Sequence, residues 1–290
     1  MKTFRSIAAV LAFALAFPAG AATFLWEVKS VTNRVYLFGT VHAAKQEWYP
    51  LPAVVEEAYA ESPVLVVEAD VTDKAALDKS ATLMLYKAPD NLKNHVEPDD
   101  YERFRKLLPR YRIPEVAVYS MKPFMAASLL VFSEWARLGY LPAIGVDSYF
   151  IHKAKADLKP IVEIEGVETQ LKLMDGLTDL EHQQIFRGTL KALEMGLTGE
   201  QITGMVNAWQ AGDPDLMLDV ARRYNDLVPG AKEFEEKFVW SRHESMLKKI
   251  EGYLNESRER HFIAVGSLHL AGPRGLVEEL RKRGYIVRQL

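Results

Sequence analysis

Short runs of β-forming apolar residues lie near both ends of the chain, and each is followed by a glycine, a helical pattern and a second apolar run. This order predicts a strand, a loop, a helix and a strand, once at each end. The first unit covers residues 34–38, about 51–60 and 64–67, and the second covers residues 261–265, about 274–283 and 285–288.

The two units also resemble each other in sequence, which suggests a pseudo-symmetric pair. Gly39-Thr-Val-His42 matches Gly266-Ser-Leu-His269, and residues 51–58 match residues 273–280. Chance similarity between two short amphipathic stretches is the alternative.

Between the units the pattern is mostly helical, with one strand at about residues 160–164. The helical stretches cover about residues 73–87, 99–109, 123–138, 146–156, 168–175, 180–197, 213–225 and 233–255. No Pro- or Gly-rich stretch is long enough to separate domains. We therefore predict a single α/β (α+β) domain over residues 22–290, whose mixed sheet is built from the two units, with a large helical insertion at about residues 73–256.

Residues 1–21 have the three parts of a secretory signal peptide. Lys2 and Arg5 precede an apolar run over residues 7–17, and Ala19-x-Ala21 supplies the small residues that signal peptidase requires. This run is far shorter than the roughly 20 residues that span a bilayer, and a short membrane anchor is the alternative. We expect cleavage near Ala21 and a periplasmic or secreted protein without a transmembrane helix in the mature chain.

Composition and charge narrow the functional classes. The 290 residues are 49% hydrophobic and include 36 Lys+Arg against 39 Asp+Glu, a net charge of -3. Because no basic block is present, the chain lacks the electrostatic footprint of a nucleic-acid binder, and we expect no nucleic-acid partner. The absence of cysteine excludes disulfides, thiolate metal sites, a catalytic thiol and a lipid-modified N-terminal cysteine. The sequence does not indicate an oligomeric state.

Each Gly-x-x-His motif directly follows a predicted strand. The glycine allows a sharp turn, and the imidazole then projects from the carboxyl end of the strand, where ligand sites of open α/β sheets lie. Two neutral imidazoles and a carboxylate make a divalent-metal site with open positions for water, and bound water loses a proton near neutral pH. Glu68 follows the run Val64–Val67 and can supply that carboxylate, whereas a solvated strand end is the alternative.

A second acidic cluster, Glu163, Glu165 and Glu168, accompanies the strand near residue 160. Strand alternation places Glu163 and Glu165 on one face, although capping of the next helix and solvation explain the cluster as well as catalysis does. Strand register decides which of Glu68, Glu163 and Glu165 touches a metal.

Arg242-His243-Glu244 lies inside the long helical pattern at about residues 233–255 and lacks the second histidine of a His-Glu-x-x-His zinc motif. An exposed helix face is the simplest interpretation.

Several short motifs follow one another in a fixed order along the mature chain. They are Leu25-Trp26, Val35–His42, Leu51-Pro52, Val66–Glu68, Lys122-Pro123, Gly145–Asp147, Lys159-Pro160, Ile164-Glu165, Gln170, Arg242, Met246 and Phe262–Leu270. In order and spacing they resemble the TraB/GumN family, which includes Tiki metalloproteases and bacterial pheromone-shutdown proteins. The resemblance covers about residues 24–290.

The resemblance implies an α/β fold shared with erythromycin esterase and haem-binding ChaN-like proteins, with both Gly-x-x-His motifs at one cleft. For Tiki-type members it also implies peptide cleavage that depends on a divalent metal, with manganese or cobalt favoured and zinc as a further candidate. The site residues implied are His42, His269 and Glu68 as ligands, Glu68, Glu165 and Arg242 as catalytic residues, and Gly39, Gly266, Gln170 and His243 as substrate-binding or supporting residues.

The chain departs from the family pattern at two places. Many members have Arg-Asn where this chain has Arg242-His243, and Gly-Ala-Gly-His is common where this chain has Gly-Ser-Leu-His. His243 either substitutes for the asparagine or has become an extra ligand.

Three functions are compatible with the sequence. The first is a metal-dependent hydrolase that cleaves a peptide or protein substrate with a metal-bound water. The second is a binding module of the same fold that sequesters a peptide, a metal or haem without catalysis. The third is hydrolysis of a non-peptide ester.

Overall fold

The computed structural model describes residues 22–223, 225–226 and 230–290. The signal peptide predicted for residues 1–21 lies outside the described residues. In the part of the chain that is described, no helix combines the length and the apolar character needed to cross a bilayer.

A six-stranded mixed sheet organises the fold, in the strand order β4-β3-β5-β2-β1-β6. Strands β2, β5, β3 and β4 run parallel, and β1 pairs antiparallel with both β2 and β6. The strands are β1 Leu25–Lys29, β2 Arg34–Thr40, β3 Val64–Val67, β4 Ile161–Glu163, β5 His261–Gly266 and β6 Ile286–Gln289. The predicted α/β fold with a mixed sheet is confirmed, and β1 is a strand that the sequence analysis did not include.

Both predicted units are present, as β2-α1-β3 and β5-α13-β6. They are spaced differently in the sheet: β5 alone separates β2 from β3, whereas β2 and β1 separate β5 from β6. The pseudo-symmetric relation between the units therefore stays a prediction, as do the single domain and the insertion at about residues 73–256.

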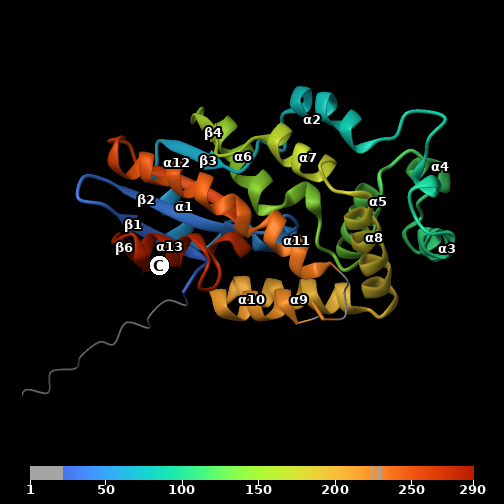
Figure 1. Ribbon diagram of the computed structural model, residues 1–290. Helices are drawn as coiled ribbons and strands as arrows, with labels where there is room; N and C mark the ends of the chain where they lie inside the picture. Colours follow the sequence, from blue (N-terminus) through green and yellow to red (C-terminus); the bar gives the residue numbers. More distant parts are fainter. Residues whose placement is uncertain (1–21, 224, 227–229) are drawn as a thin grey trace, which may run out of the picture.

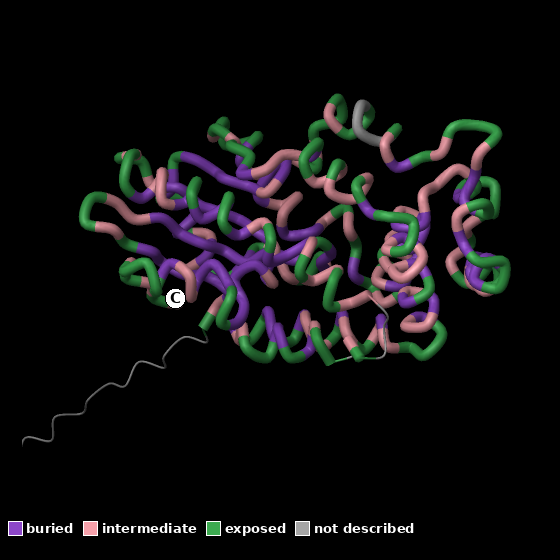
Figure 2. Tube along the Cα trace, in the orientation of Figure 1, coloured by how far each residue is buried: buried purple, intermediate pink, exposed green. Residues whose placement is uncertain are grey.

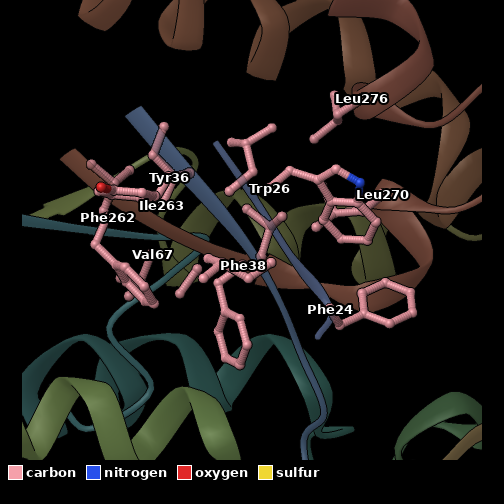
Figure 3. Packing of buried hydrophobic residues seen from close by; sticks show 14 of the residues in the cluster. Phe24, Trp26, Tyr36, Phe38, Val67, Phe262, Ile263, Leu270 and Leu276 are labelled. Atoms are coloured by element: carbon pink, nitrogen blue, oxygen red, sulfur yellow. The ribbon is translucent and has the colours of Figure 1, made fainter. Parts of the chain in front are cut away.

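Helices cover both faces of the central strands, which accounts for the nearly continuous apolar sequences of β3 and β5. On one face, Phe38 and Phe262 lie 5.6 Å apart (ring centroids) and pack with Phe150 of α6. Leu270 and Leu276 lie on the other face (Figure 3). Figure 2 shows these strands as the buried centre of the molecule.

Most of the remaining helices lie beyond the carboxyl ends of β2, β3 and β5 (Figure 1). The helices are α1 Ala53–Ala60, α2 Lys74–Ala81, α3 Pro98–Leu107, α4 Glu115–Val118, α5 Pro123–Arg137, α6 Val146–Ala156, α7 Val167–Asp175, α8 Asp179–Glu194, α9 Leu197–Gln210, α10 Pro214–Arg222, α11 Ala231–Phe238, α12 His243–Asn255 and α13 Leu276–Lys282.

Several helix predictions need correction. The helix expected over about residues 73–87 is shorter, because α2 ends at Ala81, and the four-residue helix α4 was not expected. The single helix expected over residues 233–255 is wrong, because the backbone leaves the α-helical path at Val239 and a 3-10 turn over Trp240–Arg242 separates α11 from α12. Helix α9 was not expected at all. Its start, Leu197-Thr-Gly, contains residues of low helix propensity, and burial of Ile202 and Val206 overrides that preference.

Candidate active site

The sheet order brings the predicted site residues to one edge. Strand β5 lies between β2 and β3 and runs parallel to both, so the segments that follow the three strands meet at their carboxyl ends. His42 follows β2, Glu68 follows β3, and His269 lies in a 3-10 turn, Ser267–Leu270, directly after β5. We call the polar cluster the set His42, Glu68, Asp147, Glu165, Gln170, Arg242, His243 and His269.

Arg242 joins two mostly buried carboxylates at the centre of the polar cluster. Its Nη2 donates to Oε2 of Glu68 and to Oε2 of Glu165, and its Nε donates to Oε1 of Glu165 over 2.9 Å. The side chains of Glu68 and Glu165 are only 13% and 7% exposed. Arg242 lies in the 3-10 turn between α11 and α12, and its Nη1 also donates to the Phe238 carbonyl at the end of α11 (2.7 Å).

Glu68 is bound on both oxygens. The Gly266 N–H donates to its Oε1 (2.6 Å), and Gln170 Nε2 donates to its Oε2 (2.9 Å) as well as to Glu165 Oε2 (3.2 Å). Burial alone would raise the pKa of Glu68, but the neighbouring His269 and Arg242 side chains and the Gly266 N–H favour the anion and lower the pKa to about 2. Glu68 is therefore a permanent anion at neutral pH.

Backbone bonds after β4 place Glu165 beside Glu68. The N–H groups of Glu165 and Gly166 both donate to the Glu68 carbonyl (3.0 and 2.9 Å), and Gly166 adopts φ +98°, which lets the chain turn into α7. The expectation that Glu163 and Glu165 share a strand face is wrong, because β4 ends at Glu163. The Glu163 carboxylate instead accepts from the Asp70 N–H (2.6 Å). Glu168 pairs with Lys172 on α7.

His42 is held by a carboxylate that the sequence analysis did not assign to the site. Asp147 Oδ2 lies 2.9 Å from His42 Nδ1, and Asp147 Oδ1 accepts from the Thr40 hydroxyl. Asp147 reaches them because a Cβ on Gly145 would lie 2.5 Å from the His42 carbonyl oxygen, so only glycine allows α6 to start this close. The available signal was the motif Gly145-Val-Asp147, which carries part of the family resemblance.

His269 belongs to a chain of hydrogen bonds with a fixed direction. His243 Nδ1 lies 2.9 Å from the Arg274 carbonyl, which can only accept, so His243 Nδ1 carries the proton. In neutral His243, Nε2 then accepts from His269 Nδ1 (2.9 Å), and His269 Nε2 accepts from Arg242 Nη1 (3.2 Å). His243 therefore lies in the buried interior and not on the exposed helix face that the sequence first suggested, and it orients His269.

The pKa values of the two motif histidines are shifted in opposite directions. The Asp147 carboxylate raises the pKa of His42 to about 9, although water screens part of this attraction because the side chain is 60% exposed. Burial, together with the nearby Arg242 guanidinium and against the attraction of Glu68, lowers the pKa of His269 to about 4. His269 is therefore neutral at pH 7, whereas His42 favours the protonated form.

The two motif glycines also differ in what surrounds them. A Cβ on Gly39 would lie 2.4 Å from Phe24 Cδ1, and the Gly39 carbonyl accepts from Trp209 Nε1 of α9 (2.7 Å), so Gly39 supports packing. A Cβ on Gly266 would lie 3.2 Å from Glu68 Oε1, 3.7 Å from His269 Cδ2 and 3.9 Å from His42 Nε2. Gly266 thus keeps open the small space that these three side chains border.

The imidazole and carboxylate groups around this space are of the types that bind divalent ions, but they are not already arranged as a metal site. Within the described ranges, no group of three or more His, Cys, Asp or Glu side chains is placed to hold a metal ion. Arg242 Nη1 donates to the lone pair of His269 Nε2 that an ion would use. With neutral imidazoles, the polar cluster has three carboxylates against the Arg242 guanidinium, a net charge of -2 that a divalent cation would balance.

Comparison with known proteins finds two longer relatives that are similar to most of this chain. Metalloprotease TIKI1 of Danio rerio is 23% identical over 91% of this chain and 62% of its own length. Metalloprotease TIKI2 of Xenopus tropicalis is 22% identical over 91% of this chain and 59% of its own length. The chain thus spans about three fifths of these two relatives.

A bacterial relative has nearly the same length. Uncharacterized protein YbaP of Escherichia coli (strain K12) is 22% identical over 89% of this chain and 93% of its own length. No solved structure matches the chain. The model of the TraB/PrgY/gumN family matches residues 24–289, so the chain belongs to this family.

Proposed function

We propose that this protein is an exported hydrolase that cleaves peptide bonds with the help of a divalent metal ion. The observation that carries the proposal is the convergence of His42 Nε2, Glu68 Oε1 and His269 on the space in front of Gly266. The names of the Tiki relatives, which are metalloproteases, support the same reaction class at low identity. A signal peptide at residues 1–21 would carry the protein out of the cytosol.

His42, His269 and Glu68 would hold the ion, for which manganese, cobalt and zinc are the candidates. A bound ion of this kind acts as a Lewis acid and lowers the pKa of a water molecule toward neutrality. Asp147 orients His42 through Nδ1, and His243 orients His269 through Nδ1, which is the supporting arrangement that metal-binding histidines require.

The protein's own groups divide the remaining tasks. The low pKa of Glu68 makes it a weak proton acceptor and favours a ligand role over that of a general base. Arg242 neutralises Glu68 and Glu165 and holds them in place. Gln170 donates to both carboxylates and fixes their relative position.

Metal binding to the purified mature protein tests the proposal. Elemental analysis and calorimetry with manganese, cobalt and zinc should give one ion per chain, and the double variant His42→Ala/His269→Ala should lose it. His152→Ala, a change at an exposed histidine outside the polar cluster, is the matched control and should bind like the wild type. Equal affinity in the wild type and the double variant would refute the site.

Peptide cleavage is then followed by mass spectrometry on a set of unrelated peptides, with and without a chelator. Products that appear only with the ion, and that are lost in Glu68→Gln, would support the mechanism. Metal binding without any product would favour sequestration of a ligand instead.

A metal-independent hydrolase acting on an ester is the second candidate, and a specific contact favours it. Arg242 Nη1 already occupies His269 Nε2, while His42 is paired with Asp147 on one nitrogen and largely open to solvent. Such a His-Asp pair can act as a general base in its neutral form, which the raised pKa of His42 favours only at alkaline pH. Ester hydrolysis that persists in chelator and is lost in His42→Ala would select this function.

A further inference from the structure

The hydrogen bonds of the Arg242 guanidinium fall into two sets, and together they use all of its N–H groups. Three bonds go to groups outside the proposed ligands: Nε and Nη2 donate to the two oxygens of Glu165, and Nη1 donates to the Phe238 carbonyl. The other two bonds go to proposed ligands, from Nη1 to His269 Nε2 over 3.2 Å and from Nη2 to Glu68 Oε2.

The first set is an anchor that does not depend on the second. Arg242 meets both carboxylate oxygens of Glu165, and this paired arrangement gives strength and a defined geometry. The Glu165 segment is fixed by further bonds, since its N–H donates to the Glu68 carbonyl (3.0 Å) and Lys249 Nζ donates to the Ile164 carbonyl (2.6 Å). Arg242 can therefore give up its bonds to the proposed ligands without leaving the site.

The second set covers lone pairs that the proposed ligands would offer to an ion. Arg242 Nη1 takes the lone pair of His269 Nε2, while the other ring nitrogen is bonded to His243. Arg242 Nη2 takes Oε2 of Glu68, whose Oε1 accepts from the Gly266 N–H and lies 3.6 Å from His269 Nε2. In the metal-free protein the guanidinium thus serves as the cation of the proposed ligand set.

Charge balance favours the exchange of this cation for a divalent ion. With neutral imidazoles, the carboxylates of Glu68, Asp147 and Glu165 share the single positive charge of Arg242. If Arg242 keeps Glu165 alone, that pair is neutral, and Glu68 and Asp147 together balance the charge of a divalent ion. The exchange therefore leaves no carboxylate of the polar cluster without a compensating positive charge.

We propose that Arg242 makes a self-inhibitory contact: it withdraws from Glu68 and His269, but not from Glu165, when a divalent ion binds. This inference rests on the proposed metal site and adds a control on its occupancy. Because binding has to break two hydrogen bonds of Arg242, this residue lowers the affinity for the ion. An arginine that stayed in place to support the bound ligands would have the opposite effect, and its replacement would weaken binding.

Arg242→Lys tests the exchange, because lysine keeps the positive charge but lacks the planar fork that reaches Glu165 and the proposed ligands together. Calorimetry with zinc and manganese should show binding about tenfold tighter than in the wild type, roughly the contribution of one hydrogen bond to a charged group. Arg242→Gln should also bind more tightly, and it remains available if Arg242→Lys fails to fold. Arg274→Lys makes the same change at an exposed ion pair with Glu236, so this matched control should bind like the wild type.

Crystal structures of the wild type with and without zinc give a readout that needs no variant. In the zinc-bound protein, Arg242 Nη1 should lie beyond hydrogen-bond distance from His269 Nε2, while Arg242 Nε should remain bonded to Glu165. An ion bound at this site with both Arg242 contacts to Glu68 and His269 intact would overturn the proposal. So would an affinity of Arg242→Lys equal to or below that of the wild type.

Failure of this inference is distinguishable from failure of the proposed function. If the wild type binds an ion and neither Arg242 variant binds it more tightly, the metal site stands and the self-inhibitory contact is refuted. If only the Arg242 variants bind an ion, the contact blocks the site, and the metal-dependent function of the wild type fails. If no form binds an ion, both proposals fail.

Discussion

The ends of β2 and β5 have the same Gly-x-x-His motif at the same edge of one sheet, yet their histidines differ in nearly every physical property. His42 is 60% exposed and faces a carboxylate, whereas the side chain of His269 is 6% exposed and faces a guanidinium. The pKa of His42 is raised to about 9, and that of His269 is lowered to about 4. The motif places the ring, and neighbours from distant segments decide its protonation.

This difference bears on metal binding, because an imidazole must be neutral to be a ligand. His269 is held neutral with Nδ1 protonated, so its Nε2 lone pair is available once Arg242 releases it. His42 must first lose a proton that Asp147 stabilises. We therefore expect metal affinity to rise with pH below about 9, with His42 as the group that releases the proton.

Removing Arg242 should give the largest effect, since its guanidinium donates to Glu68, Glu165 and His269. Arg242→Ala leaves two mostly buried carboxylates without their cation, which should destabilise the fold by about 3–5 kcal/mol. Urea unfolding measures the loss. Arg274→Ala removes an exposed ion pair with Glu236, both side chains being 54% exposed, and should lose no more than about 1 kcal/mol. Similar losses for the two variants would contradict the central role of Arg242.

Alanine at the two motif glycines should affect different properties, stability at Gly39 and metal binding at Gly266. Gly39→Ala brings a Cβ against the buried Phe24 ring and should destabilise the fold by about 2–3 kcal/mol through overpacking. Gly266→Ala requires shifts of only a few tenths of an ångström from Glu68, but it fills the space between the candidate ligands. Its stability should stay close to wild type while metal binding is lost. Thermal unfolding measures the stability of both variants, and calorimetry measures their metal binding. Intact metal binding in Gly266→Ala would count against the site.

His243 can be tested as the residue that orients His269. His243→Ala leaves the buried Nδ1–H of His269 without an acceptor and should destabilise the protein by about 1–2 kcal/mol. His243→Asn, the residue common in the family, offers a carbonyl oxygen there and should recover part of the loss. Nitrogen chemical shifts of His269 should report a single Nδ1–H form in the wild type and a mixture in His243→Ala. An unchanged tautomer in His243→Ala would assign the orientation to Arg242 alone.

The strands next to the site were predictable because their signals are local. Residues 34–38, 64–67 and 261–265 are apolar runs of β-forming residues that end at a glycine or a carboxylate, and the structure places β2, β3 and β5 there. Parallel neighbours then bring His42, Glu68 and His269 to one edge without further information.

Other parts of the site depend on contacts that no local pattern encodes. The break between α11 and α12 places Arg242, yet residues 233–255 have an unbroken helical pattern. The Asp147–His42 bond joins residues 105 positions apart in sequence. The direction of the bonds through His243 follows from one acceptor, the Arg274 carbonyl, whose place depends on the tertiary fold.

Asp147→Asn should give the smallest effect, and of the two motif histidines it should change the pKa of His42 alone. In metal-free protein the raised pKa of His42 contributes stability below pH 6.5, and this contribution is lost as the pH rises from 6.5 through about 9. Because the ring is 60% exposed, solvent screening keeps this slope shallow. Asp147→Asn should remove it and return the His42 pKa toward 6.5, while His269 still titrates near 4. Proton chemical shifts of both rings, followed against pH, give the two pKa values. A shift of both pKa values in Asp147→Asn would show that the two histidines do not titrate independently.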